Sequence, residues 1–345
     1  MRDGGQNPIV LDAGDMFFST TSLNENNLES EKYRCETMLS GYEKIGCDGL
    51  NIGKYELLAG LSYLKALEQR YPKIPFISAN IRDKNSQELI FSPYRIIKND
   101  NLSIGVIGVT NMVPDTMNSV IVDDYIQTGN DYIKKISKDV DIIVMLVNSA
   151  RNTHQALPKN FKNADFIFVS GSTNRTSSST PQKDGGPFLY SNGKQGKYLT
   201  VIDLNLKDNH SDIVDVSSYE QKVRQINNRI KRLQKKDPNK SLEEIYAGQV
   251  NILNLIKKYR SDLAKADSAL NNASNRMKIN NLPLNKTIKD DPEMLAMVDS
   301  AIDRCNALNP NAKKDSHNHK NLSQKKKSNR KFKKPPKPFD RKSNS

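Results

Sequence analysis

Oxygen-bearing side chains follow several predicted strands of this chain, at positions where ligands are often bound. Asp15 lies just beyond the apolar run 9–11, and Glu56, Asn148 and Asn174 lie beyond three further apolar runs. Because ligands of α/β proteins bind at the carboxyl ends of strands, these four side chains could lie close together. Their oxygens would suit one hard ion such as calcium. Two-metal hydrolysis needs more, namely a bridging carboxylate and several His, Asn and Asp ligands.

Strands and helices alternate along residues 1–206, and this alternation predicts an α/β fold. Helical spacing of apolar residues occurs around 33–45 and 57–67. The run 141–147 is apolar throughout, as in a strand that is buried on both faces. Apolar runs predict strands at 9–11, 49–52, 75–80, 94–98, 102–109, 141–147, 166–169 and 199–206.

Residues 217–275 predict a helical hairpin. A first apolar stripe includes Ile226 and Ile230, a turn signal follows at 237–239, and Ser241 with Glu244 forms a capping box that starts a second helix. Such stripes favour packing of the two helices against each other. A coiled coil that binds a partner protein is the alternative.

Residues 276–310 predict a strand and then a helix that starts near Pro292, and we expect this segment to pack on the domain. Leu295, Val298 and Ile302 share one side of that helix. The three cysteines, Cys35, Cys47 and Cys305, contain no CxxC pair, and we expect them to be buried as small hydrophobic residues.

The net charge of +14 belongs mainly to residues 311–345, which carry thirteen Lys and Arg against two Asp. The rest of the chain holds 40 basic and 37 acidic residues. The 311–345 segment has too little apolar content to fold, so we predict a disordered Lys-rich tail. Residues 313–342 could bind polyanions, including nucleic acid.

Five short motifs occur in the order found in a known family. They are LDAGD at 11–15, GCDGLNIG at 46–53, PFISANI at 75–81, GVIGVT at 105–110 and NGKQGKY at 192–198. Together they resemble the calcineurin-like metallophosphoesterases, specifically the 5′-nucleotidase and UDP-sugar hydrolase branch, over about residues 8–206. The resemblance implies a two-sheet α/β/β/α sandwich for a domain at 1–216. The whole chain also resembles cytochrome-associated nucleotidase-like proteins, although it contains no haem motif.

The chain departs from this family at the metal site. The resemblance implies that Asp15 is the bridging carboxylate, with Asn148 and Asn174 as degenerate ligands. At five positions of the site this chain has a residue that differs from the family's. Lys54 stands where the family has a metal-ligating Asn, and Tyr55 stands where it has the catalytic His. Asn148, Ser172 and Asn174 each stand where the family has a ligand His. Glu56 completes the implied pocket. Amide and serine oxygens bind transition metals less well than imidazole does. In a partly buried cleft, the positive charge of Lys54 would repel the metal ions by several kcal/mol.

These departures favour a non-catalytic binding or scaffold protein of the cell envelope, without a cofactor but with a nucleotide or another phosphate-containing ligand. The alternative is a phosphohydrolase for nucleotides or UDP-sugars with a rebuilt site, which would need manganese, zinc or calcium. Polyanion binding through the basic tail is a third hypothesis.

The family's first strand carries Asp-x-His, and the seven residues before Pro8 contain no such motif. We therefore expect the natural beginning of the protein to be missing. In that case we expect an exported, periplasmic protein. If Met1 is the true start, we expect a cytoplasmic one. No apolar run is long enough to cross a membrane.

Overall fold

The computed structural model describes residues 5–99, 102–171, 174–177, 180, 182–194, 196–208 and 211–310. The predictions for Ser172 and for the basic tail at 311–345 lie outside these residues. No helix in the described part is both long and apolar enough to span a membrane.

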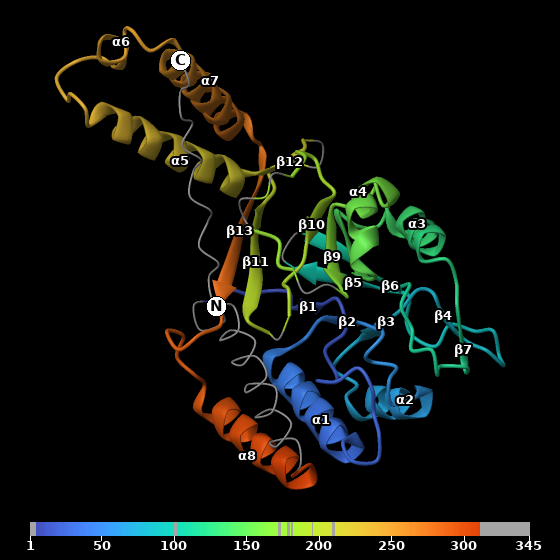
Figure 1. Cartoon of the computed structure of the whole chain (residues 1–345). Helices are drawn as coiled ribbons and strands as arrows, with labels where there is room; N and C mark the ends of the chain where they lie inside the picture. The colour runs from blue at the N-terminus through green and yellow to red at the C-terminus, as the bar shows by residue number, and fades with distance from the viewer. Residues whose placement is uncertain are drawn as a thin grey trace, which may run out of the picture.

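Two sheets face each other in the first part of the chain (Figure 1). The smaller sheet is parallel and has the order β1-β2-β3, formed by β1 (Leu11–Asp12), β2 (Gly49–Asn51) and β3 (Phe76–Ile77). The larger sheet has the order β10-β9-β8-β6-β5 and is parallel except at β5. Its strands are β5 (Tyr94–Asn99), β6 (Leu102–Thr110), β8 (Ile142–Asn148), β9 (Phe166–Ser170) and β10 (Phe188–Tyr190).

Helices cover the outer face of each sheet. Side chains of α1 (Leu28–Ile45) and α2 (Leu61–Arg70) share a core with the smaller sheet, and those of α3 (Tyr125–Ile136) and α4 (Leu157–Asn160) share one with the larger sheet. A third core fills the space between the sheets. The predicted α/β/β/α sandwich is therefore confirmed. The ribbon β4 (Ile81–Asp83) with β7 (Val120–Val122) flanks it.

Strand β8 shows why an unbroken apolar run was needed. All seven of its residues are buried. Met145 and Val147 pack under α3 and α4, whereas Val144 and Leu146 face the layer between the sheets. Because alternate side chains of a strand point to opposite faces, both sets must be apolar.

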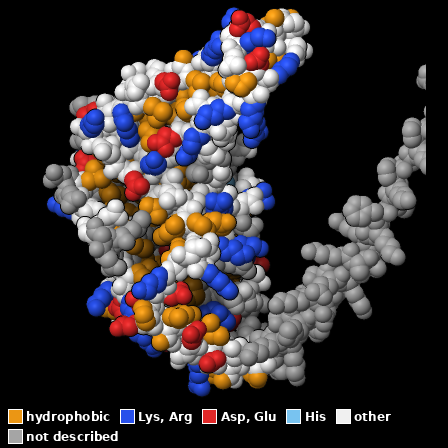
Figure 2. Space-filling view, turned by 90° about the vertical axis from the view of Figure 1, so that its left-hand side faces the viewer, with side chains coloured by type: hydrophobic (Ala, Val, Ile, Leu, Met, Phe, Trp, Pro, Cys, Tyr) orange, Lys and Arg blue, Asp and Glu red, His pale blue; other side chains and the backbone are white. Residues whose placement is uncertain are grey.

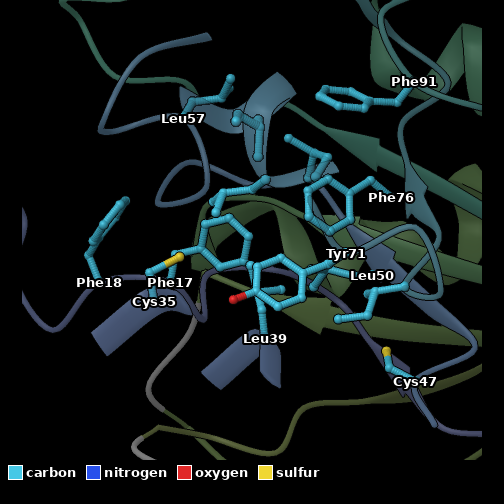
Figure 3. Packing of buried hydrophobic residues seen from close by; sticks show 14 of the residues in the cluster. Phe17, Phe18, Cys35, Leu39, Cys47, Leu50, Leu57, Tyr71, Phe76 and Phe91 are labelled. Carbon is cyan, nitrogen blue, oxygen red and sulfur yellow. The ribbon is translucent and has the colours of Figure 1, made fainter. Parts of the chain in front are cut away.

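The core between α1 and the smaller sheet is rich in aromatic rings (Figure 3). Phe17 is fully buried, and its ring centroid lies 6.2 Å from that of Phe18 and 6.1 Å from that of Phe76. Phe17 follows Asp15 by two residues, so this packing holds the loop after β1 against the core.

A third sheet joins the hairpin to the sandwich. It has the order β11-β13-β12, with β11 (Tyr198–Asn205), β12 (Ile213–Asp215) and β13 (Asn275–Pro283). The hairpin of α5 (Val216–Gln234) and α7 (Val250–Asn272) leaves this sheet from β12, returns to it through β13, and projects away from the sandwich (Figure 1). The capping box at Ser241 forms, but its helix α6 (Leu242–Ile245) is short and α7 starts separately.

The last helix, α8 (Pro292–Leu308), lies against α1. The hydroxyl of Ser30 donates to the carbonyl of Cys305 at 3.0 Å. The stripe Leu295, Val298 and Ile302 points elsewhere, and its side chains are 44%, 41% and 50% exposed. Figure 2 shows hydrophobic side chains scattered over this whole face, including its lower part, the end that carries α1 and α8 in Figure 1. The three cysteines are buried and free, as expected.

We expect Phe17→Ala to lower the free energy of unfolding by about 3–5 kcal/mol, because it removes a fully buried ring and leaves a cavity. Tyr33→Ala is the control, since Tyr33 is 38% exposed, and its loss should be much smaller. Chemical denaturation of both variants measures the difference. Equal losses would contradict the role given to Phe17.

Candidate functional site

The candidate site lies where β1, β2, β8 and β9 end. The chain turns sharply after β1, and Asp15 adopts a left-handed conformation with φ of 67°. Gly14 precedes it with φ of 97°, and a Cβ there would lie only 2.7 Å from the carbonyl oxygen of Asn51. A side chain other than hydrogen at position 14 would therefore be strained as well as crowded. This turn directs the Asp15 carboxylate toward the end of β8.

The side chain of Asn148 is the centre of the site. Its amide nitrogen donates to Asp15 Oδ2 and to Ser170 Oγ, both at 2.7 Å. Its Oδ1 accepts from the Thr110 hydroxyl at 2.9 Å and from the backbone N–H of Lys54 at 3.1 Å. Both hydrogens and both lone pairs of this fully buried amide are thus in use.

Glu56 joins two loops from the inside. Its Oε2 accepts from the backbone N–H groups of Asp15 at 2.8 Å and Gly53 at 2.9 Å, and its Oε1 accepts from that of Met16 at 2.8 Å. The side chain is fully buried. Burial, together with the negative charge of Asp15, raises the pKa of Glu56 to about 8. Through these hydrogen bonds Glu56 links the loop that follows β1 to the loop that follows β2.

The other two carboxylates are also bound within the protein. Asp15 Oδ1 accepts from the backbone N–H of Tyr55 at 3.1 Å. Burial raises the pKa of Asp15, while its hydrogen bonds and the positive charge of Lys54 act in the opposite direction. Asp12 accepts from the backbone of Gly14 at 2.8 Å and from the hydroxyl of Tyr42, and burial raises its pKa. Each carboxylate therefore faces N–H or O–H donors of the protein.

The structure brings Asp15, Glu56 and Asn148 into one network, with the backbones of Lys54 and Tyr55 at its edge. Asn174 is exposed and lines a surface pocket, described below. Across the described residues, no three His, Cys, Asp or Glu side chains are grouped so that they could hold a metal ion.

Thr110, Ser170 and Tyr42 belong to the network, but sequence reasoning did not assign them to it. Thr110 and Ser170 are the last residues of β6 and β9, so their position at strand ends was the available signal. Nothing in the local sequence indicates that Tyr42, on α1, reaches Asp12.

Comparison with known proteins finds similar sequences, although no family model matches the chain. Protein UshA of Escherichia coli is 30% identical over 109 residues, which are 31% of this chain and 20% of that protein. A 5′-nucleotidase of Vibrio parahaemolyticus is 31% identical over 106 residues, again 31% of this chain and 18% of that protein. The chain is 5′-nucleotidase-like. It spans about a fifth of the length of these relatives.

The 5′-nucleotidase-like fold is also found among solved structures. The sulfate thiohydrolase SoxB of Thermus thermophilus matches with a TM-score of 0.50 and 20% identity, over 59% of this chain and 37% of that one. At this level of identity the match bears on the fold alone.

We expect Glu56→Ala to destabilise the 5′-nucleotidase-like domain by at least about 3 kcal/mol. Three backbone N–H groups lose their acceptor, that of Gly53 buried and those of Asp15 and Met16 partly buried, and each unsatisfied buried group costs about 1–3 kcal/mol. Glu56→Gln should cost less, because one oxygen remains. Urea unfolding of the two variants tests this order, and a Gln variant as unstable as the Ala variant would contradict it.

The stability of the chain should also depend on pH through Glu56. Its pKa in the fold, about 8, lies above the ordinary value of 4.5. The protonated form therefore contributes stability that is complete below the ordinary value and is lost as the pH rises through about 8. The free energy of unfolding should fall more between about pH 6 and pH 9 in the wild type than in Glu56→Gln. Parallel pH profiles would refute this assignment.

Proposed function

We propose that this chain is a non-catalytic binding or scaffold protein built on a 5′-nucleotidase-like fold. The observation that carries the proposal is the amide nitrogen of Asn148, which lies 2.7 Å from both Asp15 Oδ2 and Ser170 Oγ. A metal ion bound to Asp15 Oδ2 would face the N–H hydrogens of the Asn148 amide, whereas a metal ion needs oxygen or nitrogen lone pairs as ligands. The donor set therefore fits internal hydrogen bonding better than a pair of divalent ions.

The residue at the family's catalytic His position supports the same proposal. Tyr55 is partly buried, and burial together with the charge of Asp15 raises the pKa of its phenol above the ordinary value of 10. The phenol then stays protonated at neutral pH. The family has an imidazole at this position, and its ordinary pKa near 6.5 suits proton transfer at neutral pH, whereas that of the phenol does not.

A ligand with a phosphate group is part of the proposal. The relatives named 5′-nucleotidase act on nucleotides by name, and this chain is 31% identical to one of them over 106 residues. A location in the cell envelope, a partner for the hairpin and polyanion binding by the tail stay predictions.

We expect the purified chain to show no metal-dependent hydrolysis of AMP or of a UDP-sugar when manganese, zinc or cobalt is added. The physical reason is that the Asp15 oxygens are already hydrogen-bonded to Tyr55 and Asn148. Released phosphate or nucleoside measures turnover. A rate above about 1 s⁻¹, which is ordinary for an enzyme, would refute the proposal.

Asp15→Asn is the matched control for any weaker activity. If a trace of turnover is abolished by this substitution, the activity belongs to the site and favours a rebuilt phosphohydrolase centre. If the same trace persists in Asp15→Asn, it comes from a contaminating enzyme and the proposal stands.

A further inference from the structure

A surface pocket of about 270 Å³ lies beside the network and plays no part in it. Its lining includes three side chains that can carry positive charge, Arg151, His154 and Arg175. The polar side chains of Asn174 and Ser191 also line it, and none of the lining residues is acidic.

Three neighbouring strands bring these residues together. Arg151 and His154 belong to the 3₁₀ helix Arg151–Ala156 after β8, Arg175 follows β9, and Ser191 follows β10 directly. These strands are adjacent and parallel in the larger sheet, so their carboxyl ends share one edge. This is the edge at which ligands of α/β proteins bind.

The cationic side chains are oriented without carboxylate partners. The guanidinium carbon of Arg175 lies 4.0 Å from the ring centroid of Tyr198, so stacking holds this group in place. The Nε2 atom of His154 lies 3.0 Å from the carbonyl oxygen of Ser149, which fixes the ring. Over the described part of the chain, neither Arg151 nor Arg175 forms an ion pair.

We infer that this pocket binds the phosphate group of a small phosphomonoester. Planar guanidinium groups donate paired hydrogen bonds to phosphate oxygens, and two of them with an imidazole suit a dianion. The volume is slightly below the range of about 300–1,000 Å³ for sites that enclose a drug-sized ligand. A phosphate with a sugar-sized group therefore fits better than a whole nucleotide.

The class of ligand in this inference comes from the proposed function, but the inferred phosphate site lies away from the Asp15 network. The proposed function and this inference can therefore fail separately. Metal-dependent hydrolysis would overturn the proposed function, whereas the inference depends only on phosphate affinity and on the two arginines.

The test is calorimetric titration of the full chain with inorganic phosphate and with ribose 5-phosphate, in about 150 mM salt, without added metal. We expect Arg151→Gln and Arg175→Gln each to weaken binding at least about tenfold. Arg224→Gln on α5 is the matched control, because it removes the same charge from an exposed position outside the pocket, and it should bind like the wild type. Tighter binding of ribose 5-phosphate than of free phosphate would identify the phosphomonoester as the ligand.

Binding by the Lys-rich tail is separated by the same variants. If the tail bound the phosphate, Arg224→Gln and Arg151→Gln would change the measured affinity by the same amount. The inference is overturned if both pocket variants keep wild-type affinity, or if the wild type binds neither compound at millimolar concentration. Arg175→Lys, which keeps the charge but not the stacking on Tyr198, should bind with intermediate affinity, and thermal unfolding confirms that each variant is folded.

Discussion

The side-chain amide of Asn148 is the interaction on which the rest of this site depends. It links the loop after β1 through Asp15, the loop after β2 through Lys54, and the ends of β6 and β9 through Thr110 and Ser170. A buried amide with all four hydrogen-bonding positions filled contributes to order, whereas one left half-satisfied would be costly. The ends of four strands are thus held in one arrangement by a single neutral side chain.

That arrangement changes what the carboxylates do. Glu56 accepts from three backbone N–H groups, and Asp12 accepts from the backbone N–H of Gly14 in the turn after β1. These hydrogen bonds order the loops that follow β1 and β2. The positive charge at this edge of the larger sheet instead lies on side chains beyond β8 and β9, and that is where an anion would find donors.

Sequence patterns predicted the parts of the fold that depend on burial. The β8 run was recognisable because both of its faces meet a core. The strands β10 and β12 were not predicted, although strands as short as β2 were. The apolar stripe of α8 did not indicate which side of the helix is covered. The helix packs on α1 with a neighbouring side, where Gly41 leaves room for the methyl groups of Met294 and Met297.

The sequence by itself determined the α/β class through apolar periodicity, and the order of its motifs implied the sandwich through the family resemblance. It also indicated, through the resemblance, at which positions the chain departs from the family. Only the tertiary structure decided which donors surround Asp15, since Asn148 reaches Asp15 across 133 residues and Ser170 reaches Ala13 across 157. Hydrogen bonds depend on the distance and direction between atoms, and those are set when the strands pack side by side.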